Sequence, residues 1–367
     1  MATSPNSASV PRKTINALTS IRGVAALCVV LHHLVLFFRF NKWSSPHTLT
    51  SMLYMGFTGV DLFFVLSGFI LTIVHVQMRP RELGTFAMRR VLRLYPLHLS
   101  ILAVMAGLGW FSIIWPRHTL NWSLLPLAGT LLAPYFSLTH NPWNDVSWSA
   151  GVELSCYLAF PLGLFALRRA PSWVLAGITA ALAYTAWTLH IHDAEAWTGL
   201  PALRRGWSDF ALGAAAGLLS TRLSLNRSSA CLLETAGLGL IGWAVYAMQP
   251  PLIPLGAVML IFALKAQKGP INRLLNLRPL VYLGEISYSI YLLQMVVFMA
   301  FFSLWRVPNY PTPVLYPAIT PLFLVQQAVF IAVLIATASL TYKYIELPGQ
   351  RLWRTAARLP ARAVTAS

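Results

Sequence analysis

The stretch Ser20-Ile-Arg22-Gly-Val-Ala-Ala-Leu-Cys-Val-Val-Leu-His32-His33-Leu34 places an arginine and two histidines inside an apolar segment. Arg22 and His33 are 11 positions apart, and at roughly 100° per residue this spacing returns to within about 20° of one helical face. At about 1.5 Å per residue, the two side chains lie about 16 Å apart along that face. Because an arginine inside a membrane span is costly, it normally faces protein or a water-filled cavity. The stretch therefore predicts a membrane helix with an anion binder at one depth and a proton acceptor at another.

The composition is that of a membrane protein. Of the 367 residues, 57% are hydrophobic and only 10% are charged, and many windows approach the roughly 20 apolar residues that cross a bilayer as a helix. The net charge of +17 is assigned to cytoplasmic loops and anionic lipid contact, because no soluble basic domain remains once the spans are removed. We expect an all-α polytopic membrane protein that contacts membrane lipids and binds no nucleic acid.

The chain divides into one large domain with two short tails. Residues 1–14 are predicted to form a cytoplasmic N-terminal tail, residues 15–346 the transmembrane domain, and residues 347–367 a basic cytoplasmic C-terminal tail. The first span is expected to be an uncleaved helix, because no small-residue cleavage site follows it. The three cysteines form neither a zinc spacing nor a disulfide framework; they are Cys28, Cys156 and Cys231.

Apolar runs and basic residues together predict the topology. Eleven runs are recognised, at about 15–38, 54–78, 95–115, 124–139, 148–167, 172–190, 205–221, 231–248, 251–266, 281–303 and 321–345. Treating the short, proline-containing run 124–139 as a re-entrant or interfacial segment leaves about ten transmembrane helices, with both termini cytoplasmic. The inside loops then carry most of the basic residues, as the positive-inside rule requires. They are Arg79, Arg81, Arg89, Arg90, Arg93, Arg168, Arg169, Arg222, Arg227, Lys265, Lys268, Arg273 and Arg278.

Three polar side chains in different spans fall at a similar depth. Counted from the outer ends of their spans, His33 lies about five residues in, Asp61 about seven and Glu153 about five, so at about 1.5 Å per residue their depths agree within a few ångströms. We expect these groups to meet in the outer half of the membrane. A carboxylate beside an imidazole orients its tautomer and stabilises its charged form, so the cluster predicts a general base.

A basic cluster lies nearer the inner face. Its members are Arg22, Arg89, Arg90 and Arg93. Guanidinium groups bind phosphate oxygens bidentately, so these arginines predict a phosphate-bearing donor that enters from the cytoplasm. The alternative interpretation is that the last three are ordinary basic residues of an inside loop.

Seven motifs occur in order along nearly the whole chain. They are Leu18-Thr-Ser-Ile-Arg22-Gly-Val-Ala with Val30-Leu-His32-His33; Gly59-Val-Asp61-Leu-Phe-Phe-Val-Leu-Ser67-Gly68-Phe; Arg89-Arg90-Val-Leu-Arg93-Leu-Tyr95-Pro96; Trp148-Ser-Ala-Gly-Val-Glu153-Leu-Ser-Cys-Tyr157-Leu-Ala-Phe-Pro161; Asp209-Phe210-Ala-Leu-Gly213; Leu283-Gly284-Glu-Ile-Ser287-Tyr288-Ser289-Ile-Tyr291-Leu; and Tyr344-Ile-Glu346-Leu-Pro348. Through these motifs the sequence resembles the acyltransferase-3 family of integral membrane acyltransferases.

The resemblance implies a ten-span fold in a bacterial inner membrane. It also implies an acyl-CoA donor, usually acetyl-CoA, with no permanently bound cofactor, and transfer to a hydroxyl of an envelope or exported glycan. The family's arginine-to-histidine spacing maps onto Arg22 and His33, its acidic residue onto Glu153, and its loop arginines onto the basic cluster. The sequence departs from the family pattern at three positions. Leu154 replaces a second acid, Gly151 a serine and Gln294 a histidine.

We therefore assign candidate roles to seven residues. His33, Glu153 and Asp61 are the catalytic candidates, and the donor-binding candidates are Arg22, Arg89, Arg90 and Arg93. His32 points about 100° away from His33 and is interpreted as structural. No metal is expected, because neighbouring histidines on a helix do not converge on one ion. Ser67-Gly68 is interpreted as a close helix contact, and Glu346 and Pro348 as the end of the last span.

The predicted reaction is direct transfer, with His33 as the general base, polarised by Glu153 or Asp61. A covalent acyl-histidine or acyl-serine intermediate and a homo-oligomer are left open. Two rival functions are also left open. Intramembrane His, Asp and Glu serve proton relays, so the chain could be a proton-coupled transporter, although it has no paired broken helices. It could also be an accessory subunit of a polysaccharide export machine.

Overall fold

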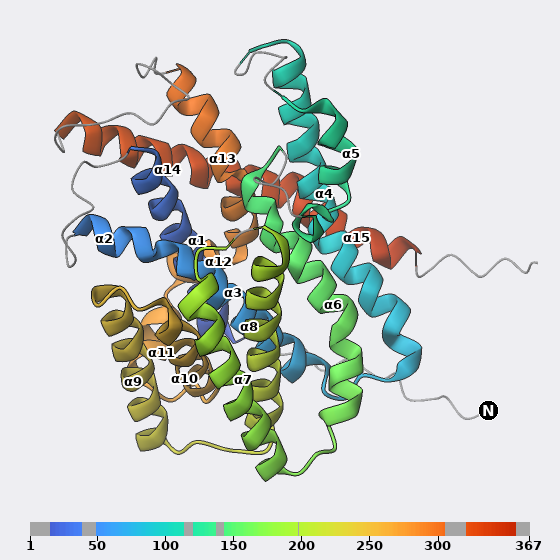
Figure 1. The fold of residues 1–367 in the computed structure, drawn as a ribbon, viewed down its shortest axis with the longest axis vertical. Coiled ribbons are helices and arrows are strands. Elements are labelled where there is room, and N and C mark those ends of the chain that lie inside the picture. The colour runs from blue at the N-terminus through green and yellow to red at the C-terminus, as the bar shows by residue number, and fades with distance from the viewer. Residues whose placement is uncertain are drawn as a thin grey trace, which may run out of the picture.

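The computed structural model describes residues 15–38, 49–113, 120–136, 143–196, 198–304 and 321–356. Within these ranges the chain forms helices and no strand, which confirms the all-α prediction. The helices assemble into one bundle, with α1, α3 and α8 near its middle (Figure 1). The long helices are α1 (Asn16–Phe37), α3 (Gly59–His75), α4 (Leu83–Trp110), α6 (Trp148–Leu167), α7 (Ser172–Asp193), α8 (Gly199–Ser220), α9 (Arg227–Tyr246), α10 (Ile253–Lys265), α13 (Ser287–Leu304) and α14 (Pro321–Thr341). The short helices are α2 (Leu49–Tyr54), α5 (Leu125–Gly129), α11 (Pro270–Leu275), α12 (Arg278–Glu285) and α15 (Leu347–Ala356).

The helices account for the predicted number of spans. Seven helical segments of the described chain are long and apolar enough to cross a membrane, and α12 with α13, bent by 66°, makes an eighth. Helix α10 is apolar but only 13 residues long. Helix α8 has 22 residues and carries Arg204, Arg205 and Asp209, which lower its hydropathy. Counting these two gives ten, and the chain is an all-α polytopic membrane protein.

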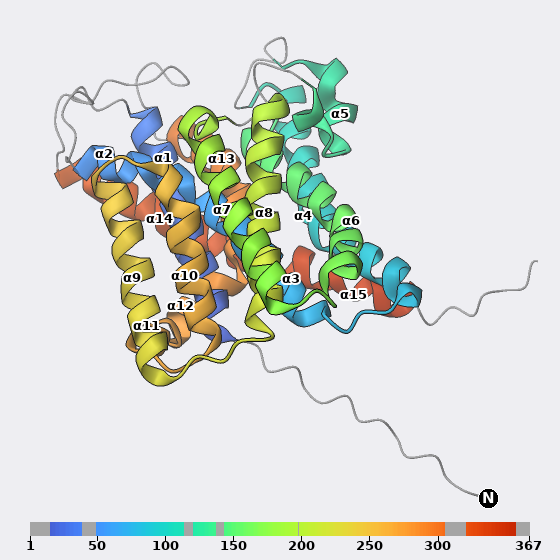
Figure 2. The ribbon, with the colours of Figure 1, turned by 60° about the horizontal axis from the view of Figure 1, so that its bottom comes forward.

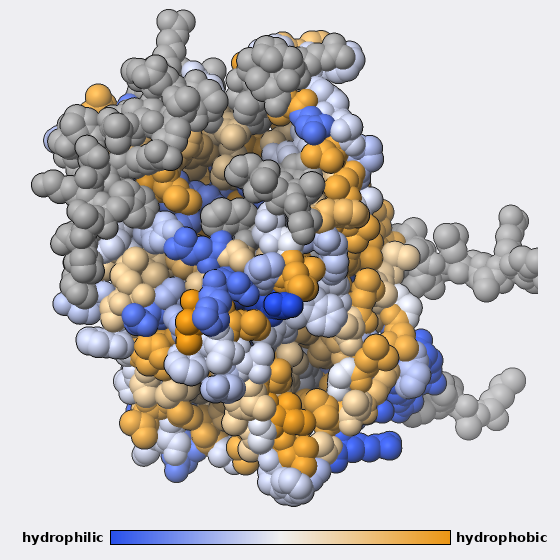
Figure 3. Space-filling model, in the orientation of Figure 1, coloured by the Kyte–Doolittle hydropathy of each residue, from blue (hydrophilic) through white to orange (hydrophobic). Residues whose placement is uncertain are grey.

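The outward faces of the helices are apolar. On α6, Leu158 and Leu162 are exposed, and on α4 the same holds for Leu99 and Val104. Figure 3 shows apolar patches over the side of the molecule formed by these two helices. Apolar side chains that would be costly in water suit contact with lipid, so this surface agrees with a membrane location.

The run 124–139 does not form a continuous helix. Its described part contains α5 between two short 3₁₀ turns, Trp122–Leu124 and Ala133–Tyr135, and residues 137–139 lie outside the described ranges. Side chains of α4 bind its carbonyl groups: His98 Nε2 donates to Ala128 O at 2.9 Å, and the Tyr95 hydroxyl donates to Thr130 O at 2.9 Å. Irregular backbone at membrane depth needs such partners, so a broken segment packed on protein replaces a span here.

The loops assigned to the inside contact one another. Arg168 Nη1 donates to Met78 O at 2.7 Å, and Arg222 Nη2 donates to the carbonyl of Arg168 at 2.7 Å. Lys268 Nζ donates to Leu225 O at 2.7 Å. Basic side chains thus bind carbonyls near the ends of neighbouring helices, where the helix dipole favours cations. The loops after α3, α6, α8 and α10 therefore lie at one end of the bundle, and Figure 2 shows α7, α8, α9 and α10 side by side.

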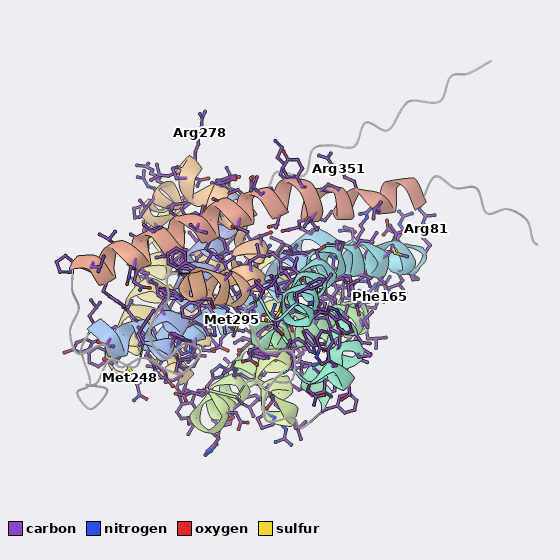
Figure 4. All side chains as sticks on the ribbon, turned by 90° about the horizontal axis from the view of Figure 1, so that it is seen from above. Arg81, Phe165, Met248, Arg278, Met295 and Arg351 are labelled. Carbon is purple, nitrogen blue, oxygen red and sulfur yellow. The ribbon has the colours of Figure 1, made fainter. Side chains whose placement is uncertain are left out.

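Two predicted boundaries are corrected. Helix α4 begins at Leu83, so Arg89, Arg90 and Arg93 lie on a helix rather than in a loop that enters it. Arginine is a good helix former, and an apolar-run criterion cannot detect a polar helical extension. The last span also continues past Glu346. A π-helical turn, Tyr342–Glu346, joins α14 to α15, and together they form one long rod along the side of the molecule (Figure 4).

Pro348 does not stop this rod: the helix continues through it after the π-helical turn Tyr342–Glu346, and an interior proline can bend a helix without ending it. The predicted C-terminal tail therefore begins as a helix. Residues 357–367 lie outside the described ranges.

Candidate active site

An arginine-lined cavity of about 140 Å³ lies among α1, α3, α4 and α6. Arg22 of α1 and Arg90 and Arg93 of α4 line it. The guanidinium carbon of Arg90 lies 5.5 Å from the centre of the Tyr157 ring, a cation–π distance that orients the side chain. Arg89 is adjacent to Arg90, so it points about 100° away, and it is not among the described residues of this lining. The structure brings together three of the four predicted donor-binding arginines.

A narrow cavity of about 40 Å³ adjoins the first. Arg22 lines both cavities, and Glu153 faces the second one with Tyr288 and Tyr291. Glu153 Oε1 accepts a hydrogen bond from Ser67 Oγ at 2.6 Å and another from the Tyr157 hydroxyl. This carboxylate is therefore held in place from α3 and from its own helix, at the level of Arg22.

A larger cavity, about 540 Å³, is lined by His33. Tyr291 lines both this cavity and the narrow one. The three spaces thus form a series from the arginines through Tyr291 to His33. The first two share Arg22, and the last two share Val60 and Tyr291. The volume of the last space is typical of a small-molecule site. Its charged lining residues are Asp145, Glu195 and Arg205.

The hydrogen bonding of His33 defines which ring nitrogen is available. Its Nδ1 lies 2.9 Å from the carbonyl oxygen of Val29, and a carbonyl can only accept, so Nδ1 carries the hydrogen. In the neutral ring, Nε2 then carries the lone pair and can accept a proton. The side chain of Gln294 lies beside the ring. One of the departures from the family pattern is thus a direct neighbour of the candidate base.

His32 is held differently from His33. Its Nδ1 donates to the carbonyl of Tyr54 at 2.6 Å, and its ring packs against the Phe57 ring with centroids 5.5 Å apart. It is buried. These contacts tie α1 to α2 and to the turn before α3, in agreement with a structural role.

Asp61 belongs to a separate buried cluster. Its Oδ1 lies 3.3 Å from Arg205 Nε and 3.4 Å from His190 Nε2, and His190 Nε2 lies 3.5 Å from Asp209 Oδ2. All four residues are buried, and they come from α3, α7 and α8. The expected meeting of Asp61, His33 and Glu153 is therefore not found, and Asp61 is not among the described residues that line the His33 cavity.

The reason for this difference is geometric. Counting residues gives the depth of a side chain but not the direction in which it points around the helix axis. Asp61 points toward α7 and α8, whereas Glu153 faces the narrow cavity with Arg22.

Two members of this buried cluster were missed from the sequence. His190 lies near the end of an apolar run, and Arg205 was assigned to an outside loop. A histidine inside a span is itself a signal and could have identified the first. Arg205 also lies over the Trp148 ring, 5.2 Å from its centre, and lines the His33 cavity. The ion pair with Asp61 thus holds Arg205, a charged residue of that cavity wall, in place.

The same cluster has the composition of a metal site. Ligand atoms of Asp61, His190 and Asp209 all lie within 4.8 Å of one another. Arg205, however, already places a cation against Asp61, and a buried ion beside a guanidinium would be repelled. The residues therefore fit a mixed ion-pair cluster better than a site for a metal cation.

Comparison with known proteins identifies the family to which the chain belongs. Residues 15–341 match the family described as an acyltransferase domain, acyltransferase-3. "Acyltransferase MdmB" of Streptomyces mycarofaciens is 30% identical over 323 residues, which cover 77% of this chain and 78% of that protein. "Putative membrane-bound transacylase BcsY" of Komagataeibacter xylinus is 30% identical over 310 residues, 77% of this chain and 72% of that protein. No solved structure is significantly similar. The chain belongs to the acyltransferase-3 family and is a membrane acyltransferase.

Proposed function

We propose that the protein moves an acyl group from acyl-CoA to a hydroxyl of an envelope or exported polysaccharide, or of a lipid-linked sugar, in a bacterial inner membrane. The observation that carries this proposal is the series of three cavities. It begins at three arginines, passes Arg22 and Tyr291, and ends at His33. Acetyl-CoA, the donor implied by the sequence resemblance, is the first donor to test.

The arginine end of the series suits the nucleotide part of CoA. Three guanidinium groups line one small space, and phosphates are the ligands that such groups bind most strongly. The positive-inside rule places this end toward the cytoplasm, where acyl-CoA is made. The pantetheine arm, which is long and slender, would then pass the narrow space beside Glu153.

The His33 end suits the transfer step. Nε2 of His33 removes the proton of the acceptor hydroxyl, and the oxygen attacks the thioester carbonyl. The carbon–sulfur bond breaks, and the sulfur takes the proton back from His33 to leave as free CoA. Arg22 lies with Glu153 in the preceding space, so its role is to hold the donor rather than to contact the acceptor.

The outer cavity also suits a sugar. Trp148 and Tyr54 offer aromatic faces, and Asp145 and Glu195 offer carboxylate acceptors for hydroxyl groups. The Tyr54 hydroxyl donates to Glu195 Oε1 at 2.7 Å, so these two side chains are already paired in one wall. An acceptor hydroxyl bound here would lie in the same space as His33.

The test is release of free CoA from acetyl-CoA by the purified protein in detergent, with a crude envelope glycan as acceptor. We expect His33→Ala to reduce release by about 10²–10⁴-fold, the usual contribution of a general base, while size-exclusion profiles stay unchanged. His192→Ala, at an exposed histidine of α7, is the matched control. Full activity of the His33 variant would refute the assignment.

One observation favours the transporter alternative, the buried cluster of Asp61, His190, Arg205 and Asp209. Ionisable groups inside a membrane also serve proton relays. A transporter would move sugar or acyl compounds into liposomes in response to a pH gradient and would leave acyl-CoA intact. Acyl-CoA turnover without such flux supports the enzyme. Flux without turnover supports the transporter.

A further inference from the structure

Helices α1 and α13 run in the same direction along the series of cavities. Near their first turns, Arg22 and Tyr288 line the same narrow space. Further along, Gln294 lies beside the His33 ring. Residues of α1 and α13 therefore lie together at two successive depths, first at the level of the arginines and then at the level of His33.

A third level lies beyond His33. The rings of Phe37 on α1 and Phe298 on α13 are 4.4 Å apart, edge to face. Phe330 of α14 packs against Phe298, with centroids 5.7 Å apart. All three rings line the cavity that contains His33. We call Phe37, Phe298 and Phe330 the aromatic wall.

The two sides of this cavity differ in character. Its charged lining residues, Asp145, Glu195 and Arg205, come from the segments around α6, α7 and α8. Beyond the histidines, Tyr291 and Gln294, the residues that α1, α13 and α14 contribute are all apolar. They are Val29, Val30, Leu34, Leu36, Met295 and the aromatic wall. So large an apolar surface does not match the hydroxyl groups of a carbohydrate.

We propose that the aromatic wall is the pocket for the acyl chain of the donor, and that the enzyme prefers acyl-CoA chains of about four to eight carbons to acetyl. This inference rests on the proposed function. A donor whose phosphates lie at the arginines and whose carbonyl lies at His33 must extend its acyl chain in the one remaining direction along the series. That direction leads to Phe37 and Phe298.

The length follows from helix geometry. Phe37 is four residues beyond His33, or about 6 Å along α1. Bonds of about 1.5 Å set at an angle advance an extended chain by about 1.3 Å per methylene, so roughly four to five methylenes span that distance. An acetyl group has only a methyl beyond its carbonyl, so it would not reach the aromatic wall and would forgo the dispersion energy that a longer chain gains there.

The test is a chain-length series of acetyl-, butyryl-, hexanoyl-, octanoyl- and dodecanoyl-CoA with the purified protein in detergent. Thermal stabilisation reports binding without any acceptor, and release of free CoA reports turnover. We expect kcat/KM to rise roughly threefold to fourfold for each added methylene up to the preferred length, the usual gain for a buried methylene. Dodecanoyl-CoA, which overruns the wall, should be a poorer donor.

Variants of the pocket should move this preference. Met295 of α13, labelled near the middle of the view in Figure 4, is partly buried and lines the cavity. Met295→Trp should fill the pocket and shift the preference toward acetyl-CoA. Phe330→Leu should enlarge the pocket and broaden the preference toward longer acyl chains. Phe323→Leu is the matched control: Phe323 lies on the same helix and is also buried, but the described cavity lining does not include it.

Three outcomes are informative. The pocket is supported if the protein prefers chains of four to eight carbons and if Met295→Trp or Phe330→Leu shifts this preference while Phe323→Leu does not. Acetyl-CoA as the best donor, with the same chain-length profile in the folded variants, overturns it and assigns the apolar side to the acceptor. No stabilisation by any acyl-CoA, with no CoA release, overturns the proposed function itself and the pocket with it.

Discussion

At the scale of single residues, two charged groups with similar sequence signals have different surroundings. Glu153 accepts hydrogen bonds from Ser67 and Tyr157 beside the cavities. Asp61 instead lies against Arg205 and His190 in the buried cluster. Both are acids inside apolar spans, and only their contacts separate a group that faces the proposed substrate path from one that holds helices together.

Removing the Asp61 carboxylate should destabilise the protein more than it alters chemistry. Truncating one partner of a buried ion pair leaves a charge without compensation, at a cost of about 3–5 kcal/mol. We expect Asp61→Ala to lower the melting temperature in detergent and the yield of monodisperse protein, whereas His33→Ala leaves both near the wild-type values. A stable but inactive Asp61→Ala protein would instead show that Asp61 is a catalytic residue.

Adjacent arginines on α4 provide an internal comparison for donor binding. Arg90 lines the arginine cavity and Arg89 is not among its described lining residues. A hydrogen bond to a charged group contributes about 1.5–3 kcal/mol, so Arg90→Gln should raise the KM for acyl-CoA by about ten- to a hundredfold with little change in kcat. Arg89→Gln should change KM much less. Equal effects would show that general basic charge, rather than this cavity, attracts the donor.

At the scale of elements, helices α3 and α8 cross at a contact made of small residues. A Cβ atom built on Gly68 would come within 2.0 Å of Phe210 O, and one on Gly213 within 1.9 Å of Val65 O. The backbones therefore touch, as small-residue contacts in membranes allow. This confirms the interpretation of Ser67-Gly68 as a close helix contact. The contact matters for the site because α3 and α8 also carry Asp61 and Arg205.

A methyl group at this crossing should force the two helices apart. Overpacking of a close contact costs about 1–3 kcal/mol, so Gly213→Ala should lower the melting temperature in detergent and reduce activity. Gly239→Ala on α9 is the control, because a Cβ there meets nothing within 4 Å. Unchanged stability of the Gly213 variant would mean that the helices are less closely packed than the structure has them.

At the scale of the whole molecule, the series of cavities runs between the two ends of the bundle. Ser20, two residues before Arg22, donates to the carbonyl of Leu275, which ties the start of α1 to the end of α11, the short helix that precedes α12. His33 lies toward the other end of the same helix. The molecule therefore has an arginine end and a histidine end, and the proposed reaction requires that they face opposite sides of the membrane.

Thiol labelling in intact cells checks this orientation. In a background with Cys28, Cys156 and Cys231 replaced by Ala, we expect Gln249→Cys to react with a membrane-impermeant maleimide from outside. Arg278→Cys, at the arginine end, should react only after the membrane is permeabilised. Both positions are exposed, so accessibility to the reagent depends on the side of the membrane. The reverse pattern would invert the predicted topology.

The sequence by itself determined the class of the protein and the position of most of its long helices. Apolar runs mark helices because a bilayer leaves unpaired backbone groups no partner, so the run 148–167 coincides with α6 (Trp148–Leu167). Composition and charge further predict a polytopic protein with basic loops on one side. The Arg22–His33 spacing placed two groups on one helical face, because helix geometry is local and fixed.

Only the tertiary structure decided which groups meet. His33 was expected beside Asp61 and Glu153, but its neighbour is Gln294, whereas Asp61 lies against Arg205 and His190. Sequence spacing gives depth within a span, but the rotation of each helix about its axis depends on how its side chains pack against other helices. The order of the cavities and the aromatic wall likewise arise from contacts of α1 with α13 and α14, which lie far from α1 in the sequence.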